Sequence, residues 1–119
     1  MDDEQIRELI LNGKPTASLC EKLGKRYYAQ KEYQKALEYY LEGLKDNNLK
    51  SVLTYHITLE EGIADCYFKM EQYEQAVEYM NIALASVMLT GINKEHQEEM
   101  KIKLNQMKIR LKEVKNNTN

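Results

Sequence analysis

Two histidines, His56 and His96, are the side chains best suited to acid-base or metal chemistry, and they stand forty residues apart. That spacing predicts equivalent positions at the starts of successive helices. A metal site needs three or four ligands, usually at short spacings, and neither histidine has a further His or Cys at such a spacing. The cysteines, Cys20 and Cys66, also lack ligand spacing, and we expect both to be buried as small hydrophobic side chains. The sequence therefore predicts neither a metal site nor a cofactor.

Covalent catalysis requires an activated nucleophile, and the chain offers few candidates. Its serines are Ser18, Ser51 and Ser86, and none lies in the glycine-flanked turn that exposes a catalytic serine. The sequence also lacks a glycine-rich loop of the kind that binds phosphate groups. We therefore expect a protein that is not an enzyme.

The composition is that of a single helical domain spanning residues 1–119. Hydrophobic residues make up 43% of the chain and charged residues 30%, as in folded globular proteins, and one proline and five glycines leave few places for tight turns. The net charge of −2 argues against direct nucleic-acid binding, which requires a basic surface. The sequence has neither an apolar run of the roughly 20 residues that span a bilayer nor a signal-peptide pattern in its start, MDDEQ. We expect a cytoplasmic location, with the nucleus as the alternative, and no membrane partner.

The sequence contains an internal repeat, which predicts the helices that would position any site. Residues 33–40 read YQKALEYY and residues 73–80 read YEQAVEYM, a shift of forty. A period between about 20 and 50 residues is typical of stacked helical units, each too small to bury its apolar face alone. The residues that match under this shift are Tyr27 and Tyr67, Tyr33 and Tyr73, Ala36 and Ala76, Glu38 and Glu78, Tyr39 and Tyr79, and Leu44 and Leu84.

Apolar residues at three- and four-residue steps predict two helices in each unit. The first unit spans residues 17–50, and its first helix begins with a predicted capping box of Ser18 and Glu21. Its second helix is expected over about 33–46. The second unit spans residues 57–90, and the extra residues between the units are expected to lengthen the helices that flank their junction.

The pattern in these units resembles the tetratricopeptide repeat, a helix-turn-helix unit with leucine, glycine, tyrosine, alanine and a large aromatic residue at set spacings. The second unit departs from it, with alanine in place of the glycine and methionine in place of the second aromatic residue. The family's closing proline is missing, and the period of forty exceeds the usual period of about 34, as in longer-helix variants of the family. The matching residues are Leu23, Gly24, Tyr27, Tyr33, Ala36 and Tyr40 in the first unit, and Ile63, Ala64, Tyr67, Tyr73, Ala76, Met80 and Ala83 in the second.

This resemblance implies an all-α fold, a right-handed solenoid of helical hairpins whose first helices line a concave groove. In the family, that groove holds an extended peptide or a helix of another protein, so the resemblance predicts a protein-binding adaptor. Small residues such as Gly24 and Ala64 fit this fold, because helix axes approach closely only where no large side chain intervenes. Some family members clamp the acidic tail of heat-shock chaperones with a lysine and asparagines. The matching places here carry Glu21, Lys25 and Gly62, so that clamp is not assembled.

Both ends of the chain carry apolar stripes that we expect to cover the open sides of the array. Residues 3–12 are predicted to form a short N-terminal helix. Residues 93–116 are predicted to form a long C-terminal capping helix, which begins at Asn93 just after the helix-ending Gly91. Its seam is expected to pack on the second helix of the second unit. The seam residues are Met100, Leu104, Met107, Leu111 and Val114, and the expected contacts are Ala76, Met80, Ala83 and Leu84.

Beside the buried face of each first helix remains a strip of side chains that we expect to line the peptide-binding groove. Its carboxylates would attract a basic segment and its lysines an acidic one, while apolar side chains would fix the register. Apolar residues clustered on a polar strip often mark contact sites. The predicted peptide-binding residues are Glu21, Lys25 and Tyr28 in the first unit, Glu61, Asp65, Phe68 and Lys69 in the second, and Lys101, Ile102, Asn105, Lys108 and Ile109 in the last helix.

Two other interpretations of these residues stay open at this point. Tyr28 and Phe68 would complete the core if they turned inward, and Ile102 and Ile109 would then contact the N-terminal helix. Alternatively, the C-terminal helix or the exposed repeat ends would join copies of the chain into a structural homo-oligomer that needs no other partner.

Overall fold

The computed structural model describes residues 16–46, 49–91 and 93–117, with side chains from Tyr55 onward in the helix that begins at Leu49. Every regular element in this part of the chain is an α-helix, which confirms the predicted all-α class. The N-terminal helix predicted at residues 3–12 lies outside the described residues. The elements are α2 (Ala17–Ala29), α3 (Tyr33–Gly43), α4 (Leu49–Lys69), α5 (Tyr73–Thr90) and α6 (Lys94–Asn117).

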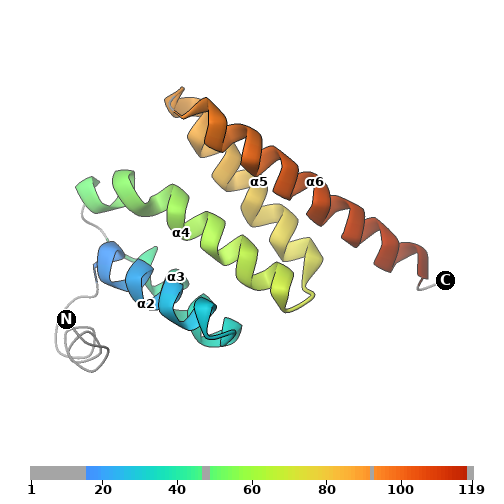
Figure 1. The fold of residues 1–119 in the computed structure, drawn as a ribbon. Coiled ribbons are helices and arrows are strands. Elements are labelled where there is room, and N and C mark those ends of the chain that lie inside the picture. Colours follow the sequence, from blue (N-terminus) through green and yellow to red (C-terminus); the bar gives the residue numbers. More distant parts are fainter. Residues whose placement is uncertain (1–15, 47–48, 92, 118–119) are drawn as a thin grey trace.

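These helices form two hairpins and a final helix (Figure 1). α2 packs against α3, α4 packs against α5, and α6 lies along α5. α4 also contacts α2 and α3, so it joins the two hairpins. α3 ends at Gly43 rather than near residue 46, and α4 begins at Leu49. His56 therefore lies well inside α4, whereas His96 lies in the first turn of α6, and the expected equivalence of the two histidines is wrong.

The turn inside each hairpin has the same geometry in both copies. Lys31 and Glu71 both have a left-handed backbone, with φ of 63° and 62°. The amide that follows each of them donates a 2.9 Å hydrogen bond to a tyrosine carbonyl at the end of the preceding helix. This is the Schellman arrangement, which glycine usually makes because other residues are strained at positive φ. The bonds run from Glu32 to Tyr27 and from Gln72 to Tyr67.

Two buried clusters of side chains share α4. One fills the space between α2, α3 and α4, and the other fills the space between α4, α5 and α6. The second cluster confirms that the seam of α6 packs on α5, although Leu111 is only half-buried and Val114 is exposed. The first cluster contains Ala17, Leu23, Tyr27, Ala36, Leu37, Tyr40, Leu59, Ile63 and Cys66. The second contains Ala64, Ala76, Met80, Ala83, Leu84, Val87, Met100, Leu104 and Met107.

The ring of Tyr40 lies between α2 and α4, where two glycines make room for it. A Cβ on Gly24 would overlap the ring, and a Cβ on Gly62 would lie 2.8 Å from the ring atom Cε2. Each glycine therefore allows a close approach that any larger residue would prevent. The forty-residue register pairs Gly24 with Ala64, yet Gly62 is the glycine of α4 that contacts the ring.

Thr16 caps α2, and the predicted capping box of Ser18 and Glu21 is wrong. The Leu19 N–H donates to Thr16 Oγ1 at 3.2 Å, which satisfies one of the free amides of the first turn. The Glu21 carboxylate pairs with a lysine instead. Asn93 caps α6 as predicted, because its Oδ1 accepts a 3.1 Å hydrogen bond from the backbone amide three residues later.

Glu60 lies in the middle of α4, and its carboxylate is buried, with 1% of the residue surface exposed. His56 Nδ1 lies 2.6 Å from Glu60 Oε1, one helical turn away. Burial raises the pKa of Glu60 above its ordinary value of 4.5, and the nearby His56 opposes that rise. A folded-state pKa above the unfolded value means that the folded protein holds this proton more tightly. The contribution of Glu60 to stability therefore falls as the pH rises from about 4.5 through the raised pKa.

Glu60→Gln is expected to increase the free energy of unfolding at pH 7 by roughly 1–3 kcal/mol, since it removes a buried charge while keeping the side-chain shape. The gain should shrink as the pH falls toward 4, where the native carboxyl is protonated as well. Urea unfolding between pH 4 and pH 8 measures this difference. Glu78→Gln on the exposed face of α5 is the matched control. A loss of stability at pH 7 would mean that the His56 pair outweighs the cost of burying Glu60.

Candidate peptide-binding groove

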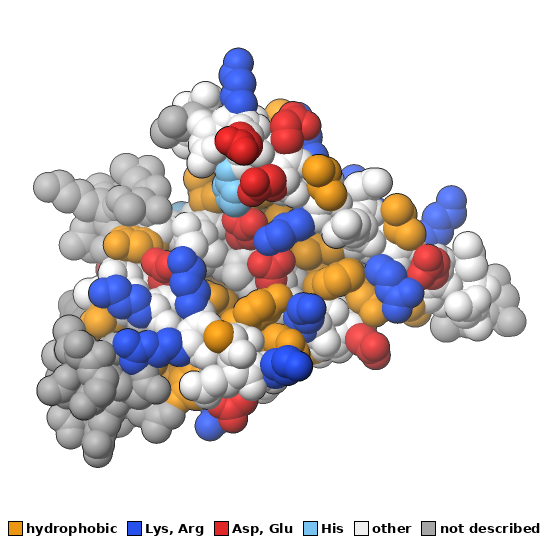
Figure 2. Space-filling view, viewed as in Figure 1, with side chains coloured by type: hydrophobic (Ala, Val, Ile, Leu, Met, Phe, Trp, Pro, Cys, Tyr) orange, Lys and Arg blue, Asp and Glu red, His pale blue; other side chains and the backbone are white. Residues whose placement is uncertain are grey.

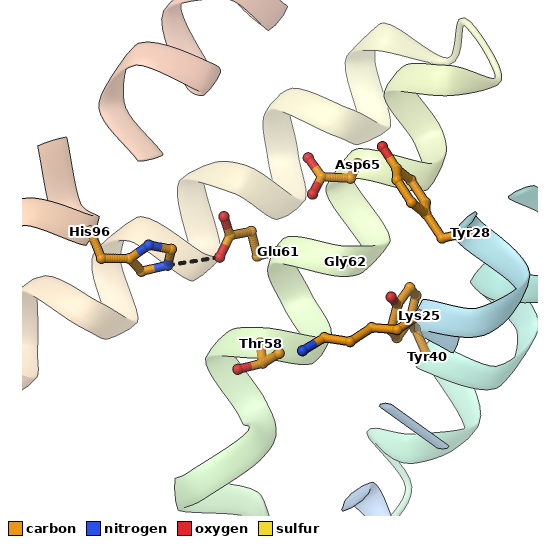
Figure 3. A pocket seen from close by; sticks show the side chains of 8 residues that line it. All are labelled: Lys25, Tyr28, Tyr40, Thr58, Glu61, Gly62, Asp65 and His96. Atoms are coloured by element: carbon orange, nitrogen blue, oxygen red, sulfur yellow. Dashed lines mark hydrogen bonds and ion pairs between the residues drawn. The ribbon is translucent and has the colours of Figure 1, made fainter. Parts of the chain in front are cut away.

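A cavity of about 350 Å³ opens between α2, α4 and the start of α6 (Figure 3). α2 contributes one long cation and one aromatic ring, and α4 contributes most of the polar wall. The ring of Tyr40, held by the two glycines, adds an aromatic surface from α3. The lining residues are Lys25, Tyr28, Tyr40, Thr58, Glu61, Gly62, Asp65 and His96.

Ion pairs connect the α4 wall of this cavity to α6. Glu61 and Asp65 lie one turn apart on α4, and the ammonium group of Lys103 approaches both. Lys103 Nζ lies 3.0 Å from Glu61 Oε1 and 3.1 Å from Asp65 Oδ2. The other oxygen of Glu61 lies 2.9 Å from His96 Nε2. Figure 2 shows acidic and basic side chains mixed across this face, with hydrophobic side chains between them.

Burial and neighbouring charges set the protonation of these groups. Burial raises the pKa of Asp65, and the ammonium of Lys103 opposes the rise. Although burial alone would lower the pKa of Lys103, the carboxylates of Asp65 and Glu61 raise it, so this lysine stays charged. Burial, together with the charge of Asp65, raises the pKa of Tyr28 to about 12. The cavity therefore contains a neutral phenol beside ionic groups at neutral pH.

Lys25 forms the rim of the cavity on α2. Its ammonium lies 2.7 Å from Glu21 Oε1, one turn earlier on the same helix. The Lys25 side chain is exposed, whereas the Glu21 side chain is mostly covered. Figure 3 shows Lys25 reaching from α2 toward Thr58 on α4. Thus Glu21 stands just behind the lining and compensates the charge of the rim lysine.

The structure brings four of the predicted groove residues into the lining: Lys25, Tyr28, Glu61 and Asp65. Phe68 does not join them. Its ring is half-buried and packs edge-on against Tyr73, with 5.4 Å between ring centroids, so it belongs to internal packing. Lys69 is exposed near the end of α4, where its charge opposes the raised pKa of Asp65.

The predicted residues of α6 lie on a different face from this cavity. Lys103 faces α4, and successive residues turn by about 100°, so Lys101 points roughly 160° away from it. Lys101 pairs with Glu98 on its own helix at 3.0 Å. Asn105 and Lys108, on the same side as Lys101, are also exposed and do not line the cavity.

Ile102 and Ile109 also point away from the cavity, on the outer face of α6. Their side chains are 60% and 50% exposed. None of the five predicted residues of α6 therefore lines the cavity, and α6 instead supplies His96 to the lining and Lys103 to the ion pairs with the α4 wall. The forty-residue register does not fix the rotation of α6, whose buried seam packs in one cluster with α5 and with Ala64 of α4. Lys103 lies beside the seam residues Met100 and Leu104 on the helix surface, and this position indicates that Lys103 faces α4.

Cys20 and Cys66 are free and buried as predicted, and burial raises the pKa of their thiols to about 11 and about 12. Within residues 16–46, 49–91 and 93–117, His, Cys, Asp and Glu side chains form no group of three that could hold a metal ion. In the same part of the chain, no helix is both long and apolar enough to cross a membrane. Comparisons with known protein families, curated proteins and solved structures find no match.

Proposed function

We propose that this protein is a non-enzymatic adaptor that holds an extended segment of another protein in the groove between α2, α4 and α6. The observation that carries this proposal is the cavity itself, because three helices that alternate along the chain all contribute to its lining. In a stack of helical hairpins, the first helix of each unit lies on the same side. The arrangement therefore fits the tetratricopeptide-like, right-handed array that the sequence resembles.

The repeated turn supports the same proposal. Both hairpins close with a Schellman arrangement at Lys31 and at Glu71, forty residues apart. Equivalent turns give equivalent helix pairs, and equivalent pairs stack with their first helices side by side. The contact between α2 and α4 is of this kind.

The size and the chemistry of the cavity favour a peptide segment over a small metabolite or a whole domain. About 350 Å³ lies at the lower end for ligand sites and suits one or two side chains. Its polar groups come from charged side chains on separate helices, and the cavity is open to solvent, so a chain could continue beyond it in both directions. Backbone groups of such a segment would stay hydrated while one side chain enters the cavity.

Lys25→Trp is expected to weaken peptide binding by at least about tenfold, because the indole would occupy the cavity. The Lys25 side chain is exposed, so the fold should persist, and urea unfolding checks the cost of leaving the mostly covered Glu21 without its ion-pair partner. Peptides selected from a random 12-residue library on the immobilised protein provide the ligands, and calorimetry gives their affinities. Asn105→Trp, on the outer face of α6, is the matched control and should leave binding unchanged. Selected peptides that bind both variants equally well would refute the groove.

A second candidate function is self-association through the outer face of α6, which the exposure of Ile102 and Ile109 favours. These two residues are seven apart and therefore lie on one stripe of the helix. Sedimentation at several concentrations distinguishes the two functions. A monomer at all concentrations excludes the homo-oligomer, and a dimer that Ile102→Asp dissociates supports it.

A further inference from the structure

The carboxylates of Glu61 and Asp65 in the α4 wall share the ammonium group of Lys103. Glu61 also contacts His96, which adds a positive charge only when it is protonated. With a neutral imidazole, Lys103 is therefore the cation that both carboxylates contact.

Burial differs between the two signs of charge. The side chains of Glu61 and Asp65 are 14% and 25% exposed, whereas that of Lys103 is 40% exposed. The carboxylates are therefore fixed in the α4 wall, while the lysine reaches them on a long chain from α6 that can turn out into water. The position of its Nζ, within 3.1 Å of one oxygen of each carboxylate, marks where a cation binds.

Aromatic rings complete the surroundings of that position. Tyr28 and Tyr40 both line the cavity, and the Tyr28 side chain lies near enough to Asp65 and Lys103 for both charges to act on its phenol. Figure 3 shows Tyr28 beside Asp65 on the wall opposite His96. A planar guanidinium can stack on an aromatic face and donate up to five hydrogen bonds, whereas an ammonium acts as a point charge.

We infer that the groove recognises an arginine side chain of the bound segment, whose guanidinium takes the place of the Lys103 ammonium between Glu61 and Asp65 and contacts the Tyr28 ring. The inference rests on the proposed function and names the chemistry of its partner. Lys103 is then an internal competitor, which occupies the carboxylates until a partner arrives. An acidic segment would instead need Lys103 in place.

Binding of short blocked peptides to the full chain labelled with [15N]glycine tests this inference. The chain has five glycines, of which Gly62 lines the cavity, while a Cβ on Gly91 would meet no atom within 4 Å. The probes are four pentapeptides, alanine except for a central arginine, citrulline, lysine or glutamate. We expect the arginine peptide to shift the Gly62 amide resonance, to leave that of Gly91 in place, and to bind about tenfold more tightly than its neutral citrulline counterpart.

Two sets of substitutions give opposite expected results. Lys103→Met should tighten arginine binding by about three- to tenfold, because it removes the competitor. Asp65→Asn, alone or with Glu61→Gln, should reduce arginine binding to the level of citrulline. Misfolding would weaken binding in every variant, so it cannot explain tighter binding by Lys103→Met. The glycine spectrum of each variant shows whether it is folded.

The inference is overturned if the arginine peptide binds no more tightly than the citrulline or lysine peptide, if the glutamate peptide binds best, or if Lys103→Met weakens binding. If the library peptides lack arginine and Lys25→Trp weakens their binding, the arginine inference is refuted while the groove is supported. Library peptides that Lys25→Trp does not affect would refute both.

Discussion

Tyr40→Ala is expected to lower the free energy of unfolding by about 3–5 kcal/mol, the range for removing a large buried aromatic side chain. The ring is buried in the first cluster, where it fills the space that Gly24 and Gly62 leave between α2 and α4. Without it, both glycines would face an empty space that backbone atoms cannot fill without moving the helices. The same loss would remove the aromatic surface of the cavity.

Chemical unfolding in urea measures this loss, and two neighbouring substitutions serve as controls. Tyr40→Phe keeps the ring and should cost much less than the alanine variant. Tyr39→Ala removes a half-buried ring of the same size that stacks on Tyr27 with 5.4 Å between centroids. If Tyr39→Ala cost as much as Tyr40→Ala, the ring of Tyr40 would not hold a special place between the two hairpins.

Local periodicity accounts for the parts of the fold that the sequence predicts well. Apolar spacing finds α5 and α6, and the repeated tyrosine and alanine residues place the hairpin turns, because both depend on residues close in the chain. The Schellman turns at Lys31 and Glu71 have no glycine, so composition offers no direct sign of them. Only the repetition of the segments around them indicates that both turns adopt one geometry.

Features that depend on distant contacts are harder to predict. Thr16 rather than Ser18 caps α2. The two residues are only two positions apart, and sequence patterns rarely place a helix boundary that finely. Gly62 has its role because the Tyr40 ring reaches it from another helix. Neither residue is predicted by the spacing on its own helix.

The predicted strips of α2 and α4 supply four residues of the cavity lining, whereas the predicted strip of α6 supplies none. α2 and α4 contact each other, and part of each strip, such as Lys25 and Asp65, lines the cavity between them. α6 packs along α5 and also forms ion pairs with α4, and the face of α6 away from both helices is turned to solvent. Lys101 is the residue that a shift of forty matches with Glu61. A capping helix does not have to present the same face as the helices inside the stack, so the matched residue can point away from the cavity.

Met100→Asp is expected to cost more than about 4 kcal/mol, because it places a carboxylate where no part of the side chain is exposed. Met100 packs in the second cluster with Met80 and Ala83 of α5. We expect α6 to lose its contact with α5, and hydrogen exchange of the α6 amides should become fast. Ile102→Asp is the matched control, since this exposed residue lies two positions away on the same helix. Its cost should stay within about 0.5 kcal/mol.

The pH dependence of this variant separates the cost of charge from the cost of lost packing. A buried carboxyl has a raised pKa, so its destabilising effect grows as the pH rises through that pKa and declines in acid. Met100→Ala, which leaves a cavity but adds no charge, should cost about 2–5 kcal/mol without this pH dependence. Because His96 and Lys103 of α6 both contact Glu61 of α4, the aspartate variant should also lose these bridges. Slow exchange of α6 amides in that variant at pH 7 would show that the helix is held by contacts other than its apolar seam.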